Sequence, residues 1–355
     1  MARSETRTAE KKPRSRRRKI LLAGAATVVA LAVAGGGFAF WTYRHLEGNL
    51  DTVDIDKALG EDRPAPLPTG AQDILVLGSD SRSGDNGDLA GGDVGGTARS
   101  DTAMVVHIPQ GRADATVVSI PRDTLVTRPA CTTSKGRQLG EAQRVMFNSV
   151  YTAGGPACVV KTVESMTGLR MNHYVEIDFA GFKELVDAMG GVQVTVDAPI
   201  KDKYSGLNLT PGTHTLDGTQ SLAFVRTRHG VGDGSDLGRI GLQQKFILAV
   251  LSQLQRQDTL SSPTKLYGVA NAATKALTTD AGLGSLPDLV TFAQSMKGLK
   301  PSRMETLMLP VAYDRIDPNR VVPAQPQDGQ LWQALRENRP IPAEAKKSPA
   351  HGTSA

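Results

Sequence analysis

One uncharged apolar stretch divides this chain into parts that must fold in different surroundings. The stretch runs for 21 residues, from Ile20 to Phe40, and as an α-helix it would be roughly 31 Å long. That length matches the hydrocarbon core of a bilayer, so the stretch predicts one membrane-spanning helix. A cleaved signal peptide is the alternative, although the apolar part of such a peptide is usually shorter.

The residues on either side of the stretch predict its orientation. Residues 1–19 form a basic tail with nine Lys or Arg and two Glu, and residues 16–19 are all basic. Basic residues are retained on the cytoplasmic side of a membrane, while Trp41 suits the opposite interface. We therefore expect residues 20–41 to anchor a single-pass cell-membrane protein whose N-terminus is cytoplasmic and whose larger part is extracytoplasmic.

The basic tail also accounts for the positive charge of the chain. The whole chain carries +5 and residues 1–19 carry +7, so the residues from Ile20 onward carry −2. The exported part therefore has no excess of basic residues with which to bind nucleic acid, and we expect no nucleic-acid partner.

The chain has two cysteines, Cys131 and Cys158, and both lie in the part expected outside the cell. An oxidising compartment permits a disulfide, and closing a loop of about 27 residues stabilises a fold by a few kcal/mol. The alternative is a pair of buried free thiols. We favour the disulfide, because the Thr-rich and Gly-rich segment around these residues needs a tether.

Composition divides the exported part into three segments. Residues 42–70 include a Pro-rich stretch and predict an extended spacer. Residues 71–315 alternate short apolar runs with amphipathic stretches, which predicts an α/β domain with a mixed central sheet. Residues 316–355 are expected to contain a helix and, from Arg339 onward, a disordered tail rich in Pro, Ala, Lys and Ser.

Periodicity locates the elements of the α/β domain. The expected strands are Asp73–Gly78, Thr102–Ile108, Thr116–Ile120, His173–Ile177, Val192–Val196 and Glu305–Leu309. The expected helices are one that begins at Gly155-Pro156 and then Phe179–Met189, Leu216–Arg228, Leu237–Gln255, Thr264–Ala276 and Leu286–Met296. Because the first three strands begin or end at charged residues, we expect those residues to meet at one rim of the sheet.

Five short segments place an arginine beside an acidic or hydroxyl residue. They are Asp80-Ser81-Arg82, Arg99-Ser100-Asp101-Thr102, Pro121-Arg122-Asp123-Thr124, Arg226-Thr227-Arg228 and Ser235-Asp236-Leu237-Gly238-Arg239. Guanidinium groups match phosphate oxygens with planar, permanently charged forks. Carboxylates, phosphate oxygens and water together complete the octahedral shell of Mg²⁺. One such segment suits an ordinary surface ion pair, but the five together predict a pyrophosphate site.

Spacing groups some of these side chains more closely. Arg239 and Gln243 are four residues apart near the start of the longest expected helix, so both project from one face, where the helix dipole also favours an anion. Asp236 at the helix start suits a cap as well as a metal ligand. Arg226 and Arg228 alternate by two, which in extended backbone places both on one side.

These segments, in this order, resemble the LytR-CpsA-Psr family of cell-envelope enzymes. The resemblance is carried by Ile74 to Arg82, Arg99 to Thr102, Ser119 to Thr124, Asn148 to Tyr151, His173 to Phe179, and the Arg226 and Asp236 segments. The family moves phosphate-linked glycopolymers from a polyprenyl lipid carrier onto peptidoglycan. Over roughly residues 71–315, the resemblance therefore implies that activity and a layered α-β-α domain around a mixed sheet.

The resemblance also implies roles for particular residues. It implies that Asp80 and Asp101 hold Mg²⁺ or Mn²⁺. It implies that seven side chains surround the pyrophosphate, namely Arg82, Arg99, Arg122, Arg226, Arg228, Arg239 and Gln243. Asp101, Arg99 and Arg122 are the expected catalytic residues. Asp101 is also a candidate to orient or deprotonate the acceptor hydroxyl.

The implied partners are a polyprenyl-pyrophosphate-linked glycan, peptidoglycan and membrane lipid. Apolar residues along Phe179–Met189 and Phe246–Leu254 suit either a slot for the lipid chain or plain core, and we favour core. The Gly-rich residues 83–97 predict a loop near the site. His107 and His173 lie in expected strands, which favours hydrogen-bonded core histidines over ligands, and His229 remains open.

Two other functions suit the same residues. A pyrophosphatase or phosphatase acting on polyprenyl pyrophosphates would use the metal and arginines with water as the acceptor. A lipid-phosphate-binding regulator of the envelope would bind without catalysis. A Ser-His-Asp hydrolase is disfavoured, because the chain has no Gly-x-Ser-x-Gly segment.

Overall fold

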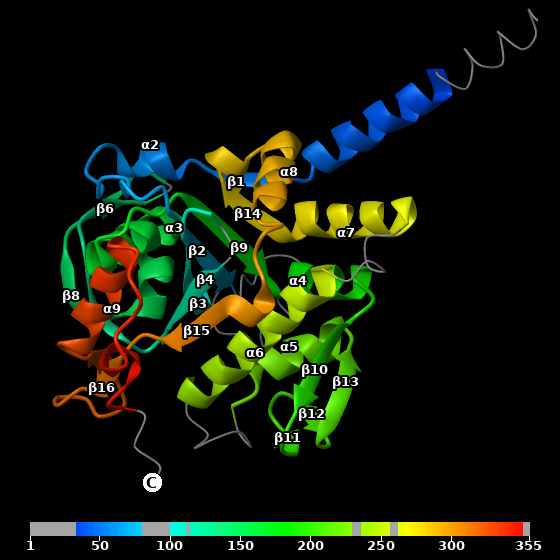
Figure 1. Cartoon of the computed structure of the whole chain (residues 1–355). Coiled ribbons are helices and arrows are strands. Elements are labelled where there is room, and N and C mark those ends of the chain that lie inside the picture. The colour runs from blue at the N-terminus through cyan, green and yellow to red at the C-terminus, as the bar shows by residue number, and fades with distance from the viewer. Residues whose placement is uncertain are drawn as a thin grey trace, which may run out of the picture. The chain divides into compact units, whose positions relative to one another are not determined.

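A computed structural model describes residues 33–79, 100–111, 114–133, 135–228, 236–255 and 262–350 of the chain (Figure 1). The chain divides into two compact units, residues 1–48 and Asn49–Ala355. In the first unit, residues 33–47 are helical. Within the described ranges, no helix is long and apolar enough to cross a membrane. Residues 20–32 of the expected anchor lie outside these ranges.

A seven-stranded mixed sheet forms the centre of the second unit (Figure 1). Its strands, in spatial order, are β1 (Asp51–Val53), β14 (Leu277–Asp280), β9 (His173–Asp178), β2 (Gln72–Ser79), β3 (Ser100–Ile108), β4 (Ala115–Ile120) and β15 (Met304–Met308). β2 pairs antiparallel with β3 and parallel with β9, and β15 pairs parallel with β4. The mixed α/β sheet expected from the sequence is confirmed.

Alternation along β2 produces the layers on the two faces of the sheet. The flanking helices are α2 (Ile55–Leu59), α3 (Phe147–Thr167), α8 (Leu286–Ser295) and α9 (Gln327–Arg336). Leu75 and Leu77 are fully buried in a hydrophobic cluster with residues of α3 and α9, whereas Ile74 belongs to a cluster packed by Phe292 of α8. Successive side chains of a strand point to opposite faces, so the apolar run of β2 is buried by helices on both sides.

A second hydrophobic cluster lies beside the sheet and belongs to the central part of the chain. Its elements are α4 (Phe179–Ala188), β10 (Val192–Val196), β11 (Ile200–Asp202), β12 (Leu207–Leu209), β13 (Gly212–Leu216), α5 (Gly218–Arg226), α6 (Asp236–Gln255) and α7 (Pro263–Ala276). β10 pairs with β13 and β11 pairs with β12, both antiparallel. α4 lies between α7 on one side and α5 with the two hairpins on the other (Figure 1).

Short elements complete the fold. β5 (Leu125–Arg128) pairs with β8 (Ala142–Met146), β6 (Cys131–Thr132) with β7 (Gln138–Leu139), and β16 (Val311–Tyr313) with β17 (Val321–Pro323). Three 3₁₀ turns are η2 (Ala281–Leu283), η3 (Pro301–Arg303) and η4 (Glu344–Lys346). Cys131 of β6 and Cys158 of α3, the pair expected to form a disulfide, are joined with an S–S distance of 2.06 Å.

The helix expected to begin at Gly155-Pro156 is confirmed as the second part of α3, which follows a first helical part that begins at Phe147. Gly155 has φ 73°, so it interrupts the helical backbone of α3, and Pro156 opens the continuous part that follows. Pro at that position lacks only an N–H that would have no partner in the helix. The Gly-Pro pair therefore marks the start of the second helical part of α3.

Part of the expected spacer, residues 42–70, belongs to the folded unit. β1 pairs parallel with β14, and Ile55 and Leu59 of α2 are buried in the same cluster as α3. Arg63 is also buried, and it donates two hydrogen bonds to the buried Glu164 at 3.1 Å. The prolines that suggested an extended spacer all lie after β1 and α2. They therefore describe only the second half of the segment, and its first half is packed.

The C-terminal segment, expected to be disordered from Arg339 onward, is packed as far as Ala350. Trp332 of α9 is 1% exposed and Ala345 of η4 is fully buried in the main cluster. The Ser348 hydroxyl donates to the carbonyl of Val311 at 2.9 Å. A few small apolar residues are enough to hold this segment in place, because distant elements form the surface against which they pack. The composition of the segment itself does not reveal that surface.

Candidate functional site

The rim of the sheet brings two of the predicted residues together. Asp101 lies at the start of β3 and Arg122 follows the end of β4. Because these strands are antiparallel with Ala103 opposite Ile120, the start of one lies beside the end of the other. Nη1 of Arg122 donates to Oδ1 of Asp101 at 2.9 Å. Both side chains are about one-quarter exposed, so the pair is accessible to a ligand.

α6 places two further predicted residues against the start of β3. Nη2 of Arg239 donates to the carbonyl of Asp101 at 3.1 Å. Nε2 of Gln243 donates to Oγ1 of Thr102 at 2.9 Å and to the carbonyl of Val225 at 3.1 Å. Arg239 and Gln243 are both nearly buried. They therefore link β3, α6 and the end of α5 as well as facing the site.

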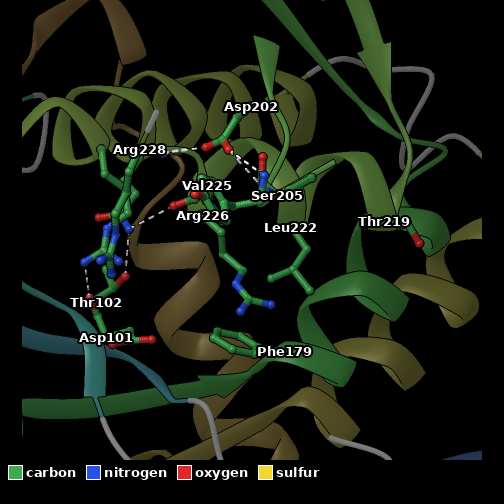
Figure 2. Close-up of a pocket in the computed structure, with 14 residues that line it drawn as sticks. Asp101, Thr102, Phe179, Asp202, Ser205, Thr219, Leu222, Val225, Arg226 and Arg228 are labelled. Atoms are coloured by element: carbon green, nitrogen blue, oxygen red, sulfur yellow. Dashed lines mark hydrogen bonds between the residues drawn. The ribbon is translucent and has the colours of Figure 1, made fainter. Parts of the chain in front are cut away.

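The end of α5 supplies two more arginines. The side chain of Asp217 caps the N-terminus of this helix, which ends at Arg226. The guanidinium carbon of Arg226 lies 4.9 Å from the ring centre of Phe179, a cation–π contact. The backbone N–H of Arg228 donates to Oδ2 of Asp202 at 3.0 Å (Figure 2). Thr227 between them is fully buried, which leaves the two arginines on the open side.

These elements enclose a cavity of about 490 Å³ (Figure 2). Among the predicted residues it is lined by Asp101, Arg226, Arg228, Arg239 and Gln243. Phe179, Asp202, Tyr204 and Ser205 also line it and were not predicted as site residues. The volume is typical of a small-molecule site, and in the described lining three arginines outnumber two aspartates. The cavity is therefore suited to an anion.

Several predictions fall outside the described residues. Asp80, Arg82, Arg99 and the side chain of Asp236 are among them, as is His229. β2 ends at Ser79, which pairs with Ser100 of β3. Ser79 and Ser100, the residues that border the undescribed segment 80–99, therefore both lie close to Asp101. The roles expected of the undescribed side chains remain predictions.

Asp101 is the one expected metal ligand within the described residues. No group of three or more His, Cys, Asp or Glu is arranged to hold a metal in the described part of the chain. Mg²⁺ needs no such group, because it is often held by one or two carboxylates together with substrate phosphates and water. A cavity-lining carboxylate next to cationic side chains fits a metal ion that binds together with phosphates.

Asp202 is a cavity-lining residue that sequence reasoning missed. It is 2% exposed and accepts hydrogen bonds from the backbone N–H groups of Tyr204 at 2.8 Å and Ser205 at 3.4 Å, besides that of Arg228. The sequence Asp202-Lys-Tyr-Ser-Gly206 is typical of a turn, so the turn itself was recognisable. Its position beside Arg228 depends on the tertiary fold.

The two apolar stretches weighed as a lipid slot or core are largely core. Phe246 is 2% exposed, and its ring centre lies 5.4 Å from that of Phe182 and 6.3 Å from that of Phe224. Within the described residues, Phe179 is the member of these stretches that lines the cavity.

His107 and His173 are hydrogen-bonded within the fold, as expected. Nδ1 of His107 lies 2.8 Å from Oδ1 of the buried Asp73, and Nδ1 of His173 lies 3.2 Å from Oδ2 of Asp280. Burial alone would raise the pKa of Asp280, but hydrogen bonds from His173 and from the backbone of Tyr174 and Gly282 lower it below its usual value.

Known proteins of one family resemble this chain over most of its length. The model of the LytR_cpsA_psr family matches residues 42–337. The cell wall biosynthesis protein LcpA of Corynebacterium glutamicum is 32% identical over 266 residues, which are 68% of this chain and 50% of that protein. The chain thus spans about half the length of this relative.

Two further proteins resemble most of the chain. The polyisoprenyl-teichoic acid–peptidoglycan teichoic acid transferase TagU of Oceanobacillus iheyensis is 31% identical over 292 residues, which are 79% of this chain and 83% of that protein. The solved structure of a LytR-Csp2A-Psr enzyme from Actinomyces oris has a TM-score of 0.59 and 25% identity, covering 84% of this chain and 97% of that one.

Proposed function

Because this chain belongs to the LytR-CpsA-Psr family, we propose that it transfers a phosphate-linked glycopolymer or sugar phosphate from a polyprenyl pyrophosphate carrier to a hydroxyl of a peptidoglycan sugar. One observation carries the proposal: Asp101, Arg226, Arg228 and Arg239 line a single cavity at the rim of the sheet. The relative TagU, which is named as a polyisoprenyl-teichoic acid–peptidoglycan teichoic acid transferase, supports the same donor and acceptor classes.

The reaction is a substitution at phosphorus. The oxygen of the acceptor hydroxyl forms a bond to the phosphorus that carries the sugar, and the bond from that phosphorus to the bridging oxygen breaks. Polyprenyl phosphate leaves with the bridging oxygen, and the acceptor becomes a sugar phosphodiester. The hydroxyl proton is taken up by Asp101 or by water. In such chemistry most of the catalysis comes from positioning and from neutralising the phosphate charge.

The described side chains divide this work. Arg226 and Arg228 bind the phosphate oxygens, since both line the cavity and the alternation along the chain places both on its open side. Arg239 adds positive charge while holding the backbone of Asp101. Arg122 orients the Asp101 carboxylate by its 2.9 Å hydrogen bond. Arg82 and Arg99 are proposed as further phosphate ligands from the family resemblance alone.

Mg²⁺ or Mn²⁺, when bound, would neutralise phosphate charge as it moves onto the leaving group. Asp101 would hold it together with Asp80, which is assigned by the family resemblance. Arg122 and a metal would share the Asp101 carboxylate, which has two oxygens and accepts from Arg122 through one of them.

The location of the reaction is part of the proposal. The basic tail, the apolar stretch that follows it and relatives named for cell-wall assembly together support a domain held at the outer face of the membrane. There it would meet both a lipid-linked donor and peptidoglycan.

Replacing Arg228 by Ala tests the proposed phosphate site. Loss of a charge-assisted hydrogen bond of about 1.5–3 kcal/mol predicts a fall in transfer of roughly ten- to over a hundredfold. Arg303→Ala is the matched control, because Arg303 pairs with Asp114 at an exposed position away from the cavity. Wild-type transfer by Arg228→Ala, measured as radiolabelled sugar phosphate on peptidoglycan, would refute the assignment of this cavity.

A further inference from the structure

The turn between β11 and β12 brings an exposed aromatic ring to the cavity. Tyr204 is 85% exposed and yet contributes to the cavity lining together with Arg226 and Arg228. The turn is polar around it, since Asp202 and Ser205 are the neighbouring lining residues. A large ring displayed on a polar turn adds nothing to the core, so its contact surface is available to a ligand.

The turn is fixed to the arginine segment. Buried Asp202 accepts from the N–H of Tyr204 at 2.8 Å and from the N–H of Arg228 at 3.0 Å. The hydroxyls of Ser205 and Thr227 lie 2.8 Å apart. Figure 2 shows Asp202 between Ser205 and the backbone of Arg228. The Asp202 carboxylate thus fixes the backbone of Tyr204 relative to the backbone of Arg228. The ring of Tyr204 is therefore held near the arginines before a ligand binds.

The position of the turn indicates which part of a ligand it meets. The proposed function requires Arg226 and Arg228 to hold a pyrophosphate. One of its two phosphates carries the polyprenyl chain, and the other is bonded directly to the first sugar, so that sugar must lie close to the arginines. The turn joined to Arg228 lines the same cavity as the two arginines. The carboxylate of Asp202 is occupied by backbone N–H groups and Ser205 by Thr227. Within the turn, the ring of Tyr204 is therefore the side-chain surface that remains for a ligand.

We propose that Tyr204 stacks on the first sugar of the donor, and this inference rests on the proposed function. A pyranose ring has an apolar C–H face and a polar edge, and Tyr likewise combines an apolar ring with a polar tip at low conformational cost. The polyprenyl chain suits the apolar lining residues Phe179, Leu222 and Val225 instead, whereas Asp202 and Ser205 beside Tyr204 are polar. By contacting the face of the sugar ring, Tyr204 would favour a polyprenyl pyrophosphate that carries a sugar over one that carries none.

The test is calorimetric binding of two probes to the full-length protein in detergent: geranyl pyrophosphate, and the same pyrophosphate carrying N-acetylglucosamine. We expect the wild type to bind the sugar-bearing probe about tenfold more tightly. Tyr204→Ala should lose this preference and keep its affinity for geranyl pyrophosphate, while Tyr204→Phe should retain the preference. Tyr313→Ala is the matched control, an exposed tyrosine of β16 outside the cavity lining.

The outcomes separate this inference from the proposed function. A sugar preference that survives in Tyr204→Ala, or that is missing from the wild type, overturns the inference and leaves the proposed function standing. If Tyr204→Ala raises the KM of the peptidoglycan acceptor and not that of the donor, the ring serves the acceptor and the donor assignment is wrong. If the wild type binds neither probe, the proposed donor site itself fails. Because Tyr204 is so exposed, its replacement should leave the melting temperature unchanged.

Discussion

At the scale of single residues, the candidate site depends on the pairing of Asp101 with Arg122. Neither residue is buried enough to be a core element, with 22% and 23% of their side chains exposed. The two are 21 positions apart in sequence and meet only because β3 and β4 are antiparallel. Their pairing fixes the direction of a carboxylate that the proposed reaction needs.

Arg122→Lys should reduce transfer even though the charge is kept. A lysine ammonium is a point charge and does not reproduce the planar fork that a guanidinium offers to a carboxylate and a phosphate. We expect kcat/KM to fall by roughly ten- to a hundredfold, corresponding to about 1.5–3 kcal/mol. The measurement is steady-state transfer, with Arg303→Lys as the control on an exposed pair. Equal activity of Arg122→Lys and wild type would remove Arg122 from the catalytic residues.

The cavity-lining residues that the sequence predicted belong to recognisable local patterns and to the segments that carry the family resemblance. Arg226 and Arg228 were found because paired arginines suit phosphate, and Arg239 and Gln243 because helical spacing puts them on one face. Asp202 was missed because a buried aspartate in a turn resembles any other aspartate in a turn. Its importance comes from the N–H of Arg228, 26 residues away, and such a contact is a property of the fold.

At the scale of elements, periodicity located most strands and helices of the domain. β2, β3 and β4 coincide with apolar runs, and α6 and α7 with amphipathic ones. The predictions that failed were made from composition, which does not show whether a segment packs against distant elements. Gly155 and Pro156 do mark a helix start, although α3 also extends before them, whereas the Pro-rich segments expected to be extended or disordered are partly packed.

Asp280 at the end of β14 should make the sheet sensitive to acid. Its folded-state pKa is lowered, so its ionised form contributes stability above the unfolded pKa of about 3.9, and this contribution is lost as pH falls through the lower folded value. We expect the difference in unfolding free energy between wild type and Asp280→Asn to shrink from pH 6 to pH 2.5 in urea titrations. A difference that stays constant over this range would contradict the assignment.

Removing the residues after Asn338 should destabilise the protein. Ile341 and Ala345 are buried in the main cluster, and burying an isoleucine side chain alone contributes about 1.5–3 kcal/mol. A chain ending at Ala350 is the control, because it keeps every described contact of this segment. The measurement is urea unfolding of both chains. Equal stability would mean that the segment is dispensable, as its composition had predicted.

At the scale of the whole molecule, the charge step at the end of the basic tail predicts topology. We expect the N-terminus in the cytoplasm and the catalytic domain outside, because basic residues flank the N-terminal end of the apolar stretch. A reporter enzyme that is active only in the cytoplasm should be silent when fused after Ala355 and active when fused before Met1. Activity of the C-terminal fusion would reverse the topology.

The whole-molecule arrangement also explains why the charged side chains of the candidate site meet at one sheet rim. β3 and β4 present Asp101 and Arg122, while α5 and α6 present Arg226, Arg228 and Arg239 from the neighbouring cluster. β3 and β4 contribute to one hydrophobic cluster and α5 and α6 to the other, and the charged side chains lie where these elements meet. The order of motifs in the sequence predicted this grouping, but only the fold gives its distances.

The most direct test of the central claim is the mass of the acceptor after reaction. Full-length protein would be incubated with Mg²⁺, a polyprenyl-pyrophosphate-linked sugar and a soluble peptidoglycan oligosaccharide, beside an Asp101→Ala variant. We predict that the oligosaccharide gains the mass of one sugar phosphate with wild type and not with the variant, and that one polyprenyl phosphate appears per transfer. Release of sugar phosphate to water with an unchanged oligosaccharide would identify a hydrolase, and no turnover of a bound donor would identify a binding protein; either result would contradict the account.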